Sequence, residues 1–180
     1  AYRTALFSQH QDLFFRAHME AFEYFGGVPE KIVIDNLKAG VIKASLHEPL
    51  VNRAYRRIAE HYGFLISPCL PQKPEHKGGV ENDMRYLKSS FLPLFHEAMK
   101  TRGMNRPTLE DMNSHLATWC RTMANTRTIS GVGESPTALF ETEKGHLRGL
   151  PPTRPEAWIF KMCRVGSDFR VQFEKAFYSA

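Results

Sequence analysis

The sequence predicts a mixed α/β (α+β) fold, with one sheet flanked by helices and part of a small β-barrel-like unit at its C-terminal end. Between residues 2 and 66, segments with strand, helix, strand, helix and strand patterns follow one another. A strand–helix–strand succession implies a crossover connection, so these strands should share a sheet that helices cover. Near the end of the chain, residues 165–173 alternate apolar and polar positions as in a β-hairpin. A two-stranded ribbon alone is marginally stable, which favours a larger β unit.

The elements of the sheet follow from hydrophobic periodicity. Residues 2–8 are short and aromatic, as in a strand. The apolar residues of Gln11–Phe25 recur at helical spacing, and Gly26 and Gly27 end this helix. The β-branched run Lys31–Ile34 predicts a strand buried on both faces. Three further elements are expected: a loop or irregular hairpin at 37–50, a helix at 51–62 and a strand at 64–66.

The second half of the chain predicts mainly helices. An apolar stripe from Val80 to Phe95 indicates an amphipathic helix, which Pro93 should break. A polar connector at 97–106 then precedes a long helix that begins after Pro107. The remaining expected elements are a loop at 126–136, a short helix at 136–144, a linker at 146–155 and a hairpin whose turn is at 166–168.

Composition favours a globular chain with an anionic partner. Of its 180 residues 42% are hydrophobic, which is enough for a core, and the net charge is +5. Many soluble proteins reach this charge without binding nucleic acid, so charge alone does not decide the partner. The three cysteines have no metal-binding spacing and no window resembles a membrane span, so we expect a reducing cytoplasm and no membrane partner.

Two carboxylates are the candidate metal ligands. Asp35 comes directly after the Lys31–Ile34 strand, where ligand sites tend to form, and Glu81 lies in the first turn of a helix. Mg²⁺ takes hard oxygen ligands, and two such ions can activate a water or a 3′-hydroxyl for phosphoryl transfer. The alternatives are ordinary ones. Asp35 and Asn36 also suit a turn, and Glu81 also suits a solvated face with an ion pair to Arg85.

The residues around these acids resemble a known family. The strand sequence KIVIDN is followed by the pattern P-x-x-P-x-x-K-G-x-V-E, formed by Pro71, Pro74, Lys77, Gly78, Val80 and Glu81. This order is similar to the integrase core of DDE transposases and retroviral integrases, with the greatest likeness to IstA-type transposases of bacterial insertion sequences. Weaker likenesses follow at Gly26 to Pro29, Ser135-Pro136, Ala138 to Phe140 and Tyr178-Ser179.

The resemblance implies an RNase H-like fold in which Asp35 matches the second catalytic acid and Glu81 the third, with two Mg²⁺ or Mn²⁺ ions in the complete enzyme. No residue here matches the first acid, which belongs on a strand ahead of residues 2–8. Asp12 is better explained as favourable charge at a helix start. The expected domains are the C-terminal part of the catalytic core at 1–100, a helical extension at 101–148, and a linker with a partial β domain at 149–180.

The resemblance also implies DNA as partner, namely transposon ends and target, together with a homo-oligomer, a helper ATPase and a bacterial cytoplasmic location. Six residues near the acids are candidate DNA contacts: Lys73, Lys77, Arg85, Lys88, Asn36 and Lys38. Exposed lysines often have no such role. Three function classes remain open: a polynucleotidyl transferase, a non-catalytic DNA-binding or assembly module derived from one, and an RNase H-like nuclease. The chain has no initiating Met, and we expect it to be part of a longer protein.

Overall fold

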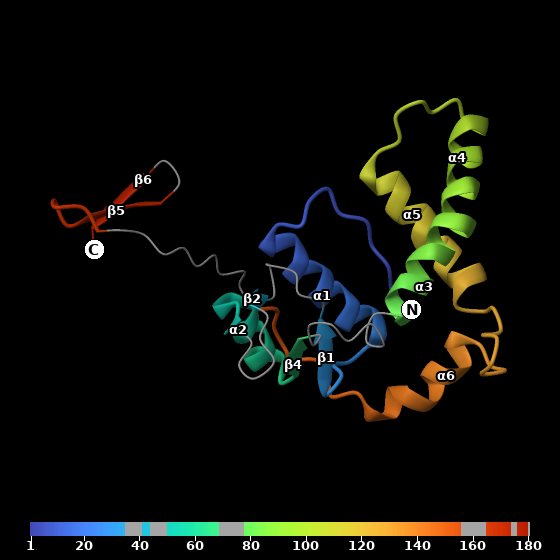
Figure 1. The fold of residues 1–180 in the computed structure, drawn as a ribbon, viewed down its shortest axis with the longest axis horizontal. Helices are drawn as coiled ribbons and strands as arrows, with labels where there is room; N and C mark the ends of the chain where they lie inside the picture. The colour runs from blue at the N-terminus through green and yellow to red at the C-terminus, as the bar shows by residue number, and fades with distance from the viewer. Residues whose placement is uncertain (35–40, 44–49, 69–77, 156–164, 174–175, 180) are drawn as a thin grey trace.

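The computed structural model describes residues 1–34, 41–43, 50–68, 78–155, 165–173 and 176–179. Helices and short two-stranded sheets make up this described part, so the fold is mixed α/β as the sequence predicts (Figure 1). Five residues of the candidate site lie outside the described ranges: Asp35, Asn36, Lys38, Lys73 and Lys77. None of the helices in these ranges combines the length and apolarity that a membrane crossing requires.

The sheet that leads to the candidate site is a parallel pair. Strand β1 (Lys31–Ile34) pairs with β4 (Leu65–Pro68), with Lys31 opposite Leu65 and Ile34 opposite Pro68. Because parallel strands run in the same direction, their carboxyl ends meet at one edge of the sheet. The predicted strand at 64–66 is therefore confirmed with slightly shifted bounds.

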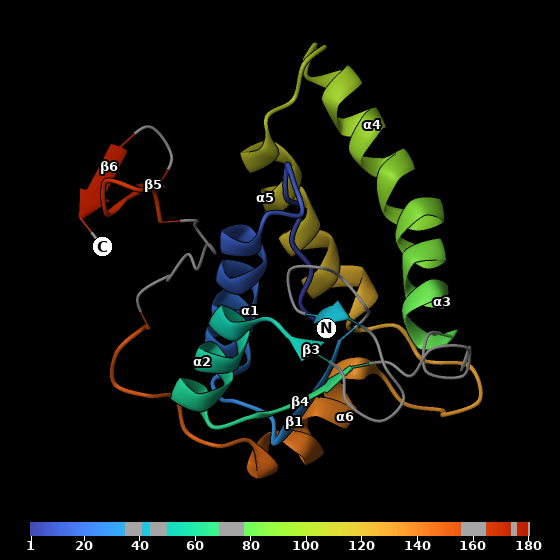
Figure 2. The ribbon, with the colours of Figure 1, turned by 60° about the vertical axis from the view of Figure 1, so that its left-hand side comes forward.

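Two helices cover this pair. Helix α1 (Gln11–Phe25) has the predicted bounds and ends at Gly26, whose φ of 70° is left-handed backbone that glycine adopts at low cost. Helix α2 (Arg53–Tyr62) begins after Asn52, whose Oδ1 accepts a hydrogen bond from the Ala54 N–H (2.9 Å). The two helices lie side by side in both views (Figures 1 and 2).

The first core lies between these helices and one face of the strands. Its buried side chains are Phe15, Met19, Phe22, Val28, Ile34, Ala54, Tyr55, Ile58, Ala59, Tyr62 and Phe64. Val33 on the other face is 54% exposed, so the prediction that Lys31–Ile34 is buried on both faces is wrong. The reason is that α1 and α2 pack on the same face, which also receives Ile32 and Ile66.

The segment at residues 2–8 is not a strand, contrary to the sequence prediction. Its polar contacts in the described part are with helices, through side chains such as Asn113 of α5 (Leu109–Trp119). Because no described strand pairs with this segment to complete a ladder, the aromatic pattern does not produce sheet structure here. By contrast, the irregular hairpin expected at 37–50 is confirmed in its described part: β2 (Val41–Lys43) and β3 (Leu50–Val51) pair antiparallel with a register shift.

Pro93 does not break the helix in which it lies. Helix α3 (Gly78–Tyr86) passes through a π-helical turn (Leu87–Phe91) into α4 (Leu92–Thr101), with Pro93 in the first turn of α4. Proline has no N–H to bond to the preceding turn, and its ring crowds the carbonyl there. The wider turn, in which the Leu92 N–H bonds to the Leu87 carbonyl, accommodates both effects. The prediction of a polar connector at 97–106 is therefore wrong for residues 97–101, which belong to α4.

The second core lies between α4 and α5. Helix α5 begins after Pro107, as predicted. Thr108 and Asp111 form a capping box at its start, and a second π-helical turn (Cys120–Ala124) continues the helix. The buried residues are Phe91, Phe95, Met99, Leu116, Trp119, Cys120 and Ala124. The first three precede residue 100, where the sequence predicts a domain boundary, and the other four follow it. Cys120 is a buried free thiol in this core.

The chain then returns to the first core. Helix α6 (Pro136–Glu143), close to its predicted bounds, passes through a 3₁₀ turn (Lys144–His146). Beyond it, Val28 and Arg148 exchange two backbone hydrogen bonds of 2.9 Å each. The neighbouring Gly27 has no room for a side chain, because a Cβ there would lie 2.7 Å from the Leu147 Cβ. The two hydrogen bonds hold the returning segment against the first core, and the glycine at position 27 permits the close approach.

The final hairpin differs from the predicted one. Strand β5 (Arg170–Phe173) pairs antiparallel with β6 (Ala176–Ser179), with Val171 opposite Tyr178. The predicted turn at 166–168 precedes β5, where the Phe169 N–H bonds to the Gly166 carbonyl (3.1 Å), and joins no two described strands. Of the alternating apolar residues 169, 171 and 173, the last two belong to β5, the first strand of the hairpin, and Phe169 lies just before it. The larger barrel-like unit stays a prediction.

Candidate metal and DNA site on helix α3

Glu81 lies in the first turn of α3, and its side chain is exposed. A carboxylate there interacts favourably with the positive end of the helix dipole. In the described part of the chain Glu81 has no ion pair, so the alternative in which Arg85 neutralises it is not what this structure contains. The carboxylate is therefore available to a ligand.

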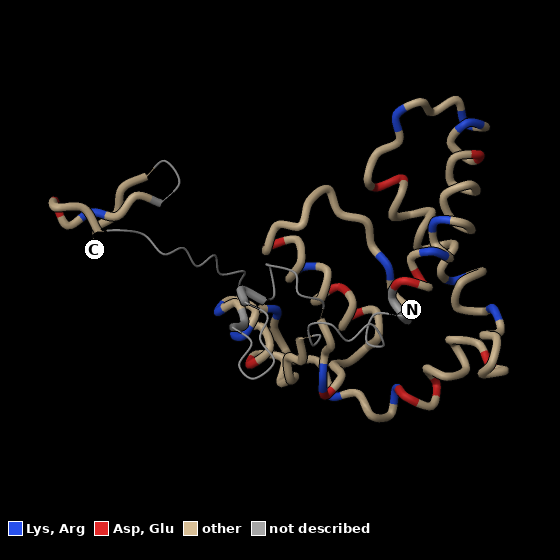
Figure 3. The backbone as a smooth tube through the Cα atoms, in the orientation of Figure 1, with Lys and Arg blue, Asp and Glu red and all other residues tan. Residues whose placement is uncertain are grey.

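Basic side chains follow Glu81 along the same helix. Arg85 is one turn later and Lys88 lies in the π-helical turn, and both are exposed. Acidic and basic positions consequently lie side by side along α3 (Figure 3). Such a face can hold a cation through Glu81 while its cations attract a polyanion.

The second predicted acid, Asp35, lies outside the described residues, as do Asn36, Lys38, Lys73 and Lys77. The residue before Asp35 is described: Ile34, the last residue of β1, is buried in the first core. The parallel register places the carboxyl ends of β1 and β4 at one edge, and α3 is the next described element after β4. Within the described residues, no three His, Cys, Asp or Glu side chains lie together as a complete metal site would require.

Two aromatic rings and an arginine support α3 on the α5 side. The Tyr86 ring lies 5.3 Å from the Trp119 ring, centroid to centroid. The Arg127 guanidinium lies 3.5 Å from the centroid of the Tyr86 ring, a cation–π contact. Sequence reasoning missed Arg127 because it lies in a loop far along the chain from Tyr86, with no periodic pattern to connect them.

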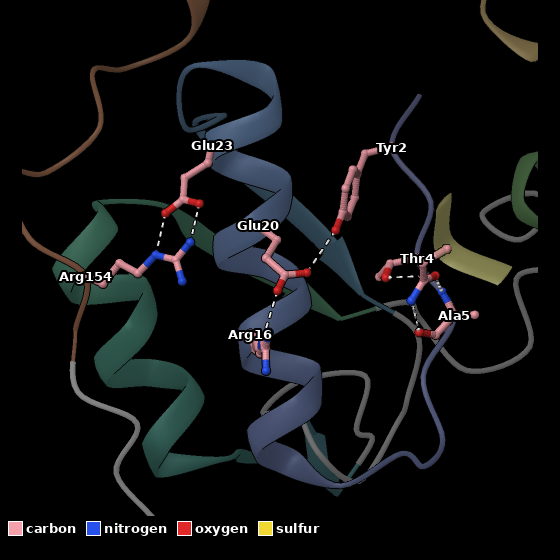
Figure 4. Close-up of polar contacts among 8 residues, drawn as sticks. Tyr2, Thr4, Ala5, Arg16, Glu20, Glu23 and Arg154 are labelled. Carbon is pink, nitrogen blue, oxygen red and sulfur yellow. Dashed lines mark hydrogen bonds and ion pairs between the residues drawn. The ribbon is translucent and has the colours of Figure 1, made fainter. Parts of the chain in front are cut away.

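Arg3 is the second residue that sequence reasoning missed. Its guanidinium forms an ion pair with Asp83, on the helix that carries Glu81. Nothing in the sequence around residue 3 indicates this partner, which lies far along the chain. The same N-terminal segment is tied to α1, where the Tyr2 hydroxyl donates to Glu20 (3.0 Å) and Arg16 donates to the other oxygen of Glu20 (2.8 Å) (Figure 4).

Elsewhere on α1, Glu23 receives two hydrogen bonds from Arg154, of the segment that follows α6 (Figure 4). These bonds hold the pKa of Glu23 below its ordinary value. Because both side chains are exposed, the pair contributes little to stability.

A cavity of about 450 Å³ lies between the N-terminal segment, α1, α3 and α5. Its walls are mostly apolar and include Met84, Leu87 and Met112. His18 also lines it; burial lowers the pKa of this histidine, while its hydrogen bond to the Phe14 carbonyl acts in the opposite direction. The cavity contains no cluster of acids, and the exposed Glu81 does not line it. The candidate site is therefore the outer face of α3.

Comparison with known proteins identifies the class of protein to which this mixed α/β chain is similar. No family model matches the chain. Its homologues are transposases, including transposases of IS21-like insertion sequences.

Three relatives illustrate the match. The candidate transposase Rv3428c of Mycobacterium tuberculosis is 35% identical over 164 residues, which are 90% of this chain and 38% of that protein. The candidate transposase y4uI of Sinorhizobium fredii is 32% identical over 99% of this chain and 34% of its own length. The transposase of insertion sequence IS21 of Pseudomonas aeruginosa is 30% identical over 86% of this chain and 37% of its own length. The chain thus spans between about a third and two fifths of these relatives.

Proposed function

We propose that this chain is part of the catalytic core of an IstA-type transposase, with an RNase H-like fold, which cleaves DNA and joins its strands in a metal-dependent reaction. The observation that carries the proposal is Glu81, an exposed carboxylate without an ion pair in the described residues, at the start of a helix with basic side chains. Support comes from the parallel β1–β4 pair, which leads into Asp35 and α3, and from the transposase homologues.

Glu81 and Asp35 would hold Mg²⁺ or Mn²⁺, because these ions prefer carboxylate oxygens. Glu81 fits this role because it is exposed and, among the residues that the structure describes, forms no ion pair. When bound, two such ions activate the attacking water or 3′-hydroxyl and stabilise the leaving oxygen. No residue of this chain matches the first acid of the site. That acid would come from another part of the protein.

DNA would lie along the outer face of α3. Arg85 and Lys88 are exposed there and would contact phosphates, which positions DNA without reading its sequence. Lys73, Lys77, Asn36 and Lys38 stay proposed contacts on the segments before α3 and after β1. The division at residues 100 and 148, the homo-oligomer, the helper ATPase and the bacterial cytoplasmic location are part of the same proposal.

The test uses the full-length transposase, an oligonucleotide that carries the transposon end, a target duplex and Mg²⁺. We expect Glu81→Gln to lower cleavage and strand transfer roughly a thousand-fold or more, because metal stabilisation of the transition state is worth several kcal/mol. DNA binding should persist. The control is Glu97→Gln, an equally exposed glutamate on α4, which should leave both reactions unchanged.

Wild-type-like cleavage by Glu81→Gln would overturn the proposed site. The alternative function, a DNA-binding or assembly module without catalysis, predicts a different result in the same assay. In that case the wild-type protein binds DNA but neither cleaves nor joins it at any Mg²⁺ or Mn²⁺ concentration.

A further inference from the structure

We infer that Arg3 is a positioning residue for the reaction: by holding Asp83 against α5, it fixes helix α3 and with it the Glu81 carboxylate. This inference rests on the proposed function, since it assigns Arg3 to the support of the same site. Arg3 itself does not face that site. It lines the apolar cavity on the inner side of α3, together with Asp83.

The contact between Arg3 and Asp83 is bidentate. Arg3 Nε donates to Asp83 Oδ2 (2.9 Å), and Arg3 Nη2 donates to Asp83 Oδ1. The Arg3 side chain is only 11% exposed and that of Asp83 is 39% exposed, so solvent screens this pair less than a surface pair. Two parallel N–H···O bonds fix the orientation of the carboxylate as well as its distance.

The same guanidinium is held on its other side by α5 and the turn that follows it. Arg3 Nη1 donates to Cys120 Sγ (3.4 Å), and the Arg3 guanidinium carbon lies 5.4 Å from the centroid of the Trp119 ring. Both partners are buried in the second core. A planar guanidinium can make these contacts and the carboxylate fork at once, whereas a lysine ammonium cannot.

The backbone that carries Arg3 is also fixed. The Ala5 N–H donates to Asn113 Oδ1 (2.7 Å), and Asn113 Nδ2 donates back to the Ala5 carbonyl (3.1 Å). One side-chain amide thus takes the place that a neighbouring strand would have. With Tyr2 bonded to Glu20 of α1, Arg3 is held between two anchored residues.

Helix α3 needs such a tether because the turn that carries Glu81 has little apolar packing, and the contact of Tyr86 with Trp119 comes only later along the helix. None of residues 81–86 is buried, and Met84 is 46% exposed. Asp83 lies two positions after Glu81, about 200° further around a helix. The ion pair therefore fixes the inner side of the helix while Glu81 faces solvent on the other side. Rotation or translation of this turn would displace the Glu81 carboxylate directly.

The experiment measures the Mg²⁺ dependence of cleavage by the full-length transposase. For Arg3→Met we expect a 10–100-fold fall in kcat or a 10–100-fold rise in the Mg²⁺ concentration for half-maximal rate, as for loss of a residue that orients a metal ligand. DNA affinity should stay within twofold. Arg3→Lys should give an intermediate loss, and the reversed pair Arg3→Asp with Asp83→Arg a partial recovery over Arg3→Asp alone.

Two further variants keep the result interpretable. Asp83→Asn weakens the ion pair but leaves the Arg3 contacts with Trp119 and Cys120, so it decides the matter if Arg3→Met does not fold. Arg154→Met, which removes an exposed ion pair with Glu23 of α1, is the matched control and should change neither activity nor Mg²⁺ dependence.

Wild-type kcat and Mg²⁺ dependence in folded Arg3→Met or Asp83→Asn would overturn the inference. So would a loss of activity that only parallels a loss of folded protein and of DNA binding. The Glu81→Gln variant distinguishes failure of the proposed function from failure of the inference about Arg3. Full activity of Glu81→Gln contradicts the proposed function. An inactive Glu81→Gln together with a fully active Arg3→Met contradicts only the role of Arg3.

Discussion

Tyr55 shows how completely single residues can be enclosed in the first core. Its side chain is 0% exposed, and its ring stacks on Phe15 at a centroid distance of 5.7 Å. The hydroxyl has no hydrogen-bond partner among the described residues. Burial raises the pKa of this phenol, so it stays neutral at physiological pH. The ring therefore stabilises the core, while the buried hydroxyl opposes that contribution.

We predict that Tyr55→Phe leaves the free energy of unfolding unchanged or raises it by up to about 1 kcal/mol, because an unsatisfied buried hydroxyl is removed. Tyr55→Ala should lower the same quantity by about 3–5 kcal/mol through the cavity it leaves. Urea unfolding followed by circular dichroism measures both. A loss of more than about 1 kcal/mol in Tyr55→Phe would show that the hydroxyl is bonded after all.

At the residue scale, the local sequence pattern predicted part of the candidate site but none of the residues that hold helix α3 in place. The position of Glu81 in the first helical turn followed from the glycines and the apolar stripe around it, and the structure confirms it. Arg3 and Arg127 could not be found this way. Their contacts with Asp83 and Tyr86 join distant parts of the chain, and such pairings depend on the packing of whole helices.

Helix α5 has the clearest end signal of any described element. The Asp111 N–H donates to Thr108 Oγ1 (3.1 Å), and the Thr108 N–H donates to Asp111 Oδ2 (2.8 Å). Hydrogen bonds from the Thr108 side chain and backbone also lower the pKa of Asp111. This part of the cap is thus present above the unfolded pKa of about 3.9 and is lost as pH falls through the lower folded pKa.

Thr108→Ala should lower the free energy of unfolding by about 1 kcal/mol at neutral pH, as for loss of other N-caps. The control Thr122→Ala removes an exposed hydroxyl that bonds to the Thr118 carbonyl within the helical run, and it should cost less than about 0.5 kcal/mol. Chemical denaturation of both variants provides the comparison. Equal losses in the two would mean that the capping box contributes nothing specific.

At the scale of elements, periodicity and cap residues predicted α1, α2, α5 and α6 nearly to their ends, because these signals are local. The predictions failed where packing against another element determines the local structure. Residues 2–8 have a strand pattern, but helices surround them in the described part, and Pro93 lies in a helix that a π-helical turn adjusts. Burial of β1 depends likewise on which faces the helices cover.

In the described part of residues 1–155, the chain is organised around two cores that the N-terminal segment connects. Tyr2 contacts α1 of the first core, and Arg3 contacts α3 and the buried Trp119 and Cys120 of the second. Strand β1, which ends at Ile34 just before Asp35, packs in the first core, and helix α3, which carries Glu81, packs against the second core through Tyr86. The proposed site would thus depend on how the two cores are held together, which no local sequence pattern encodes.

The most direct test of this account is the location of bound metal. Crystals of the full-length protein with the DNA that the proposal assigns to it can be soaked with Mn²⁺, which is identified by its anomalous scattering. We predict a Mn²⁺ ion bound by carboxylate oxygens of both Asp35 and Glu81, and loss of that ion in Glu81→Gln. Mn²⁺ bound elsewhere, with the carboxylates of Asp35 and Glu81 too far apart to share an ion, would contradict the account.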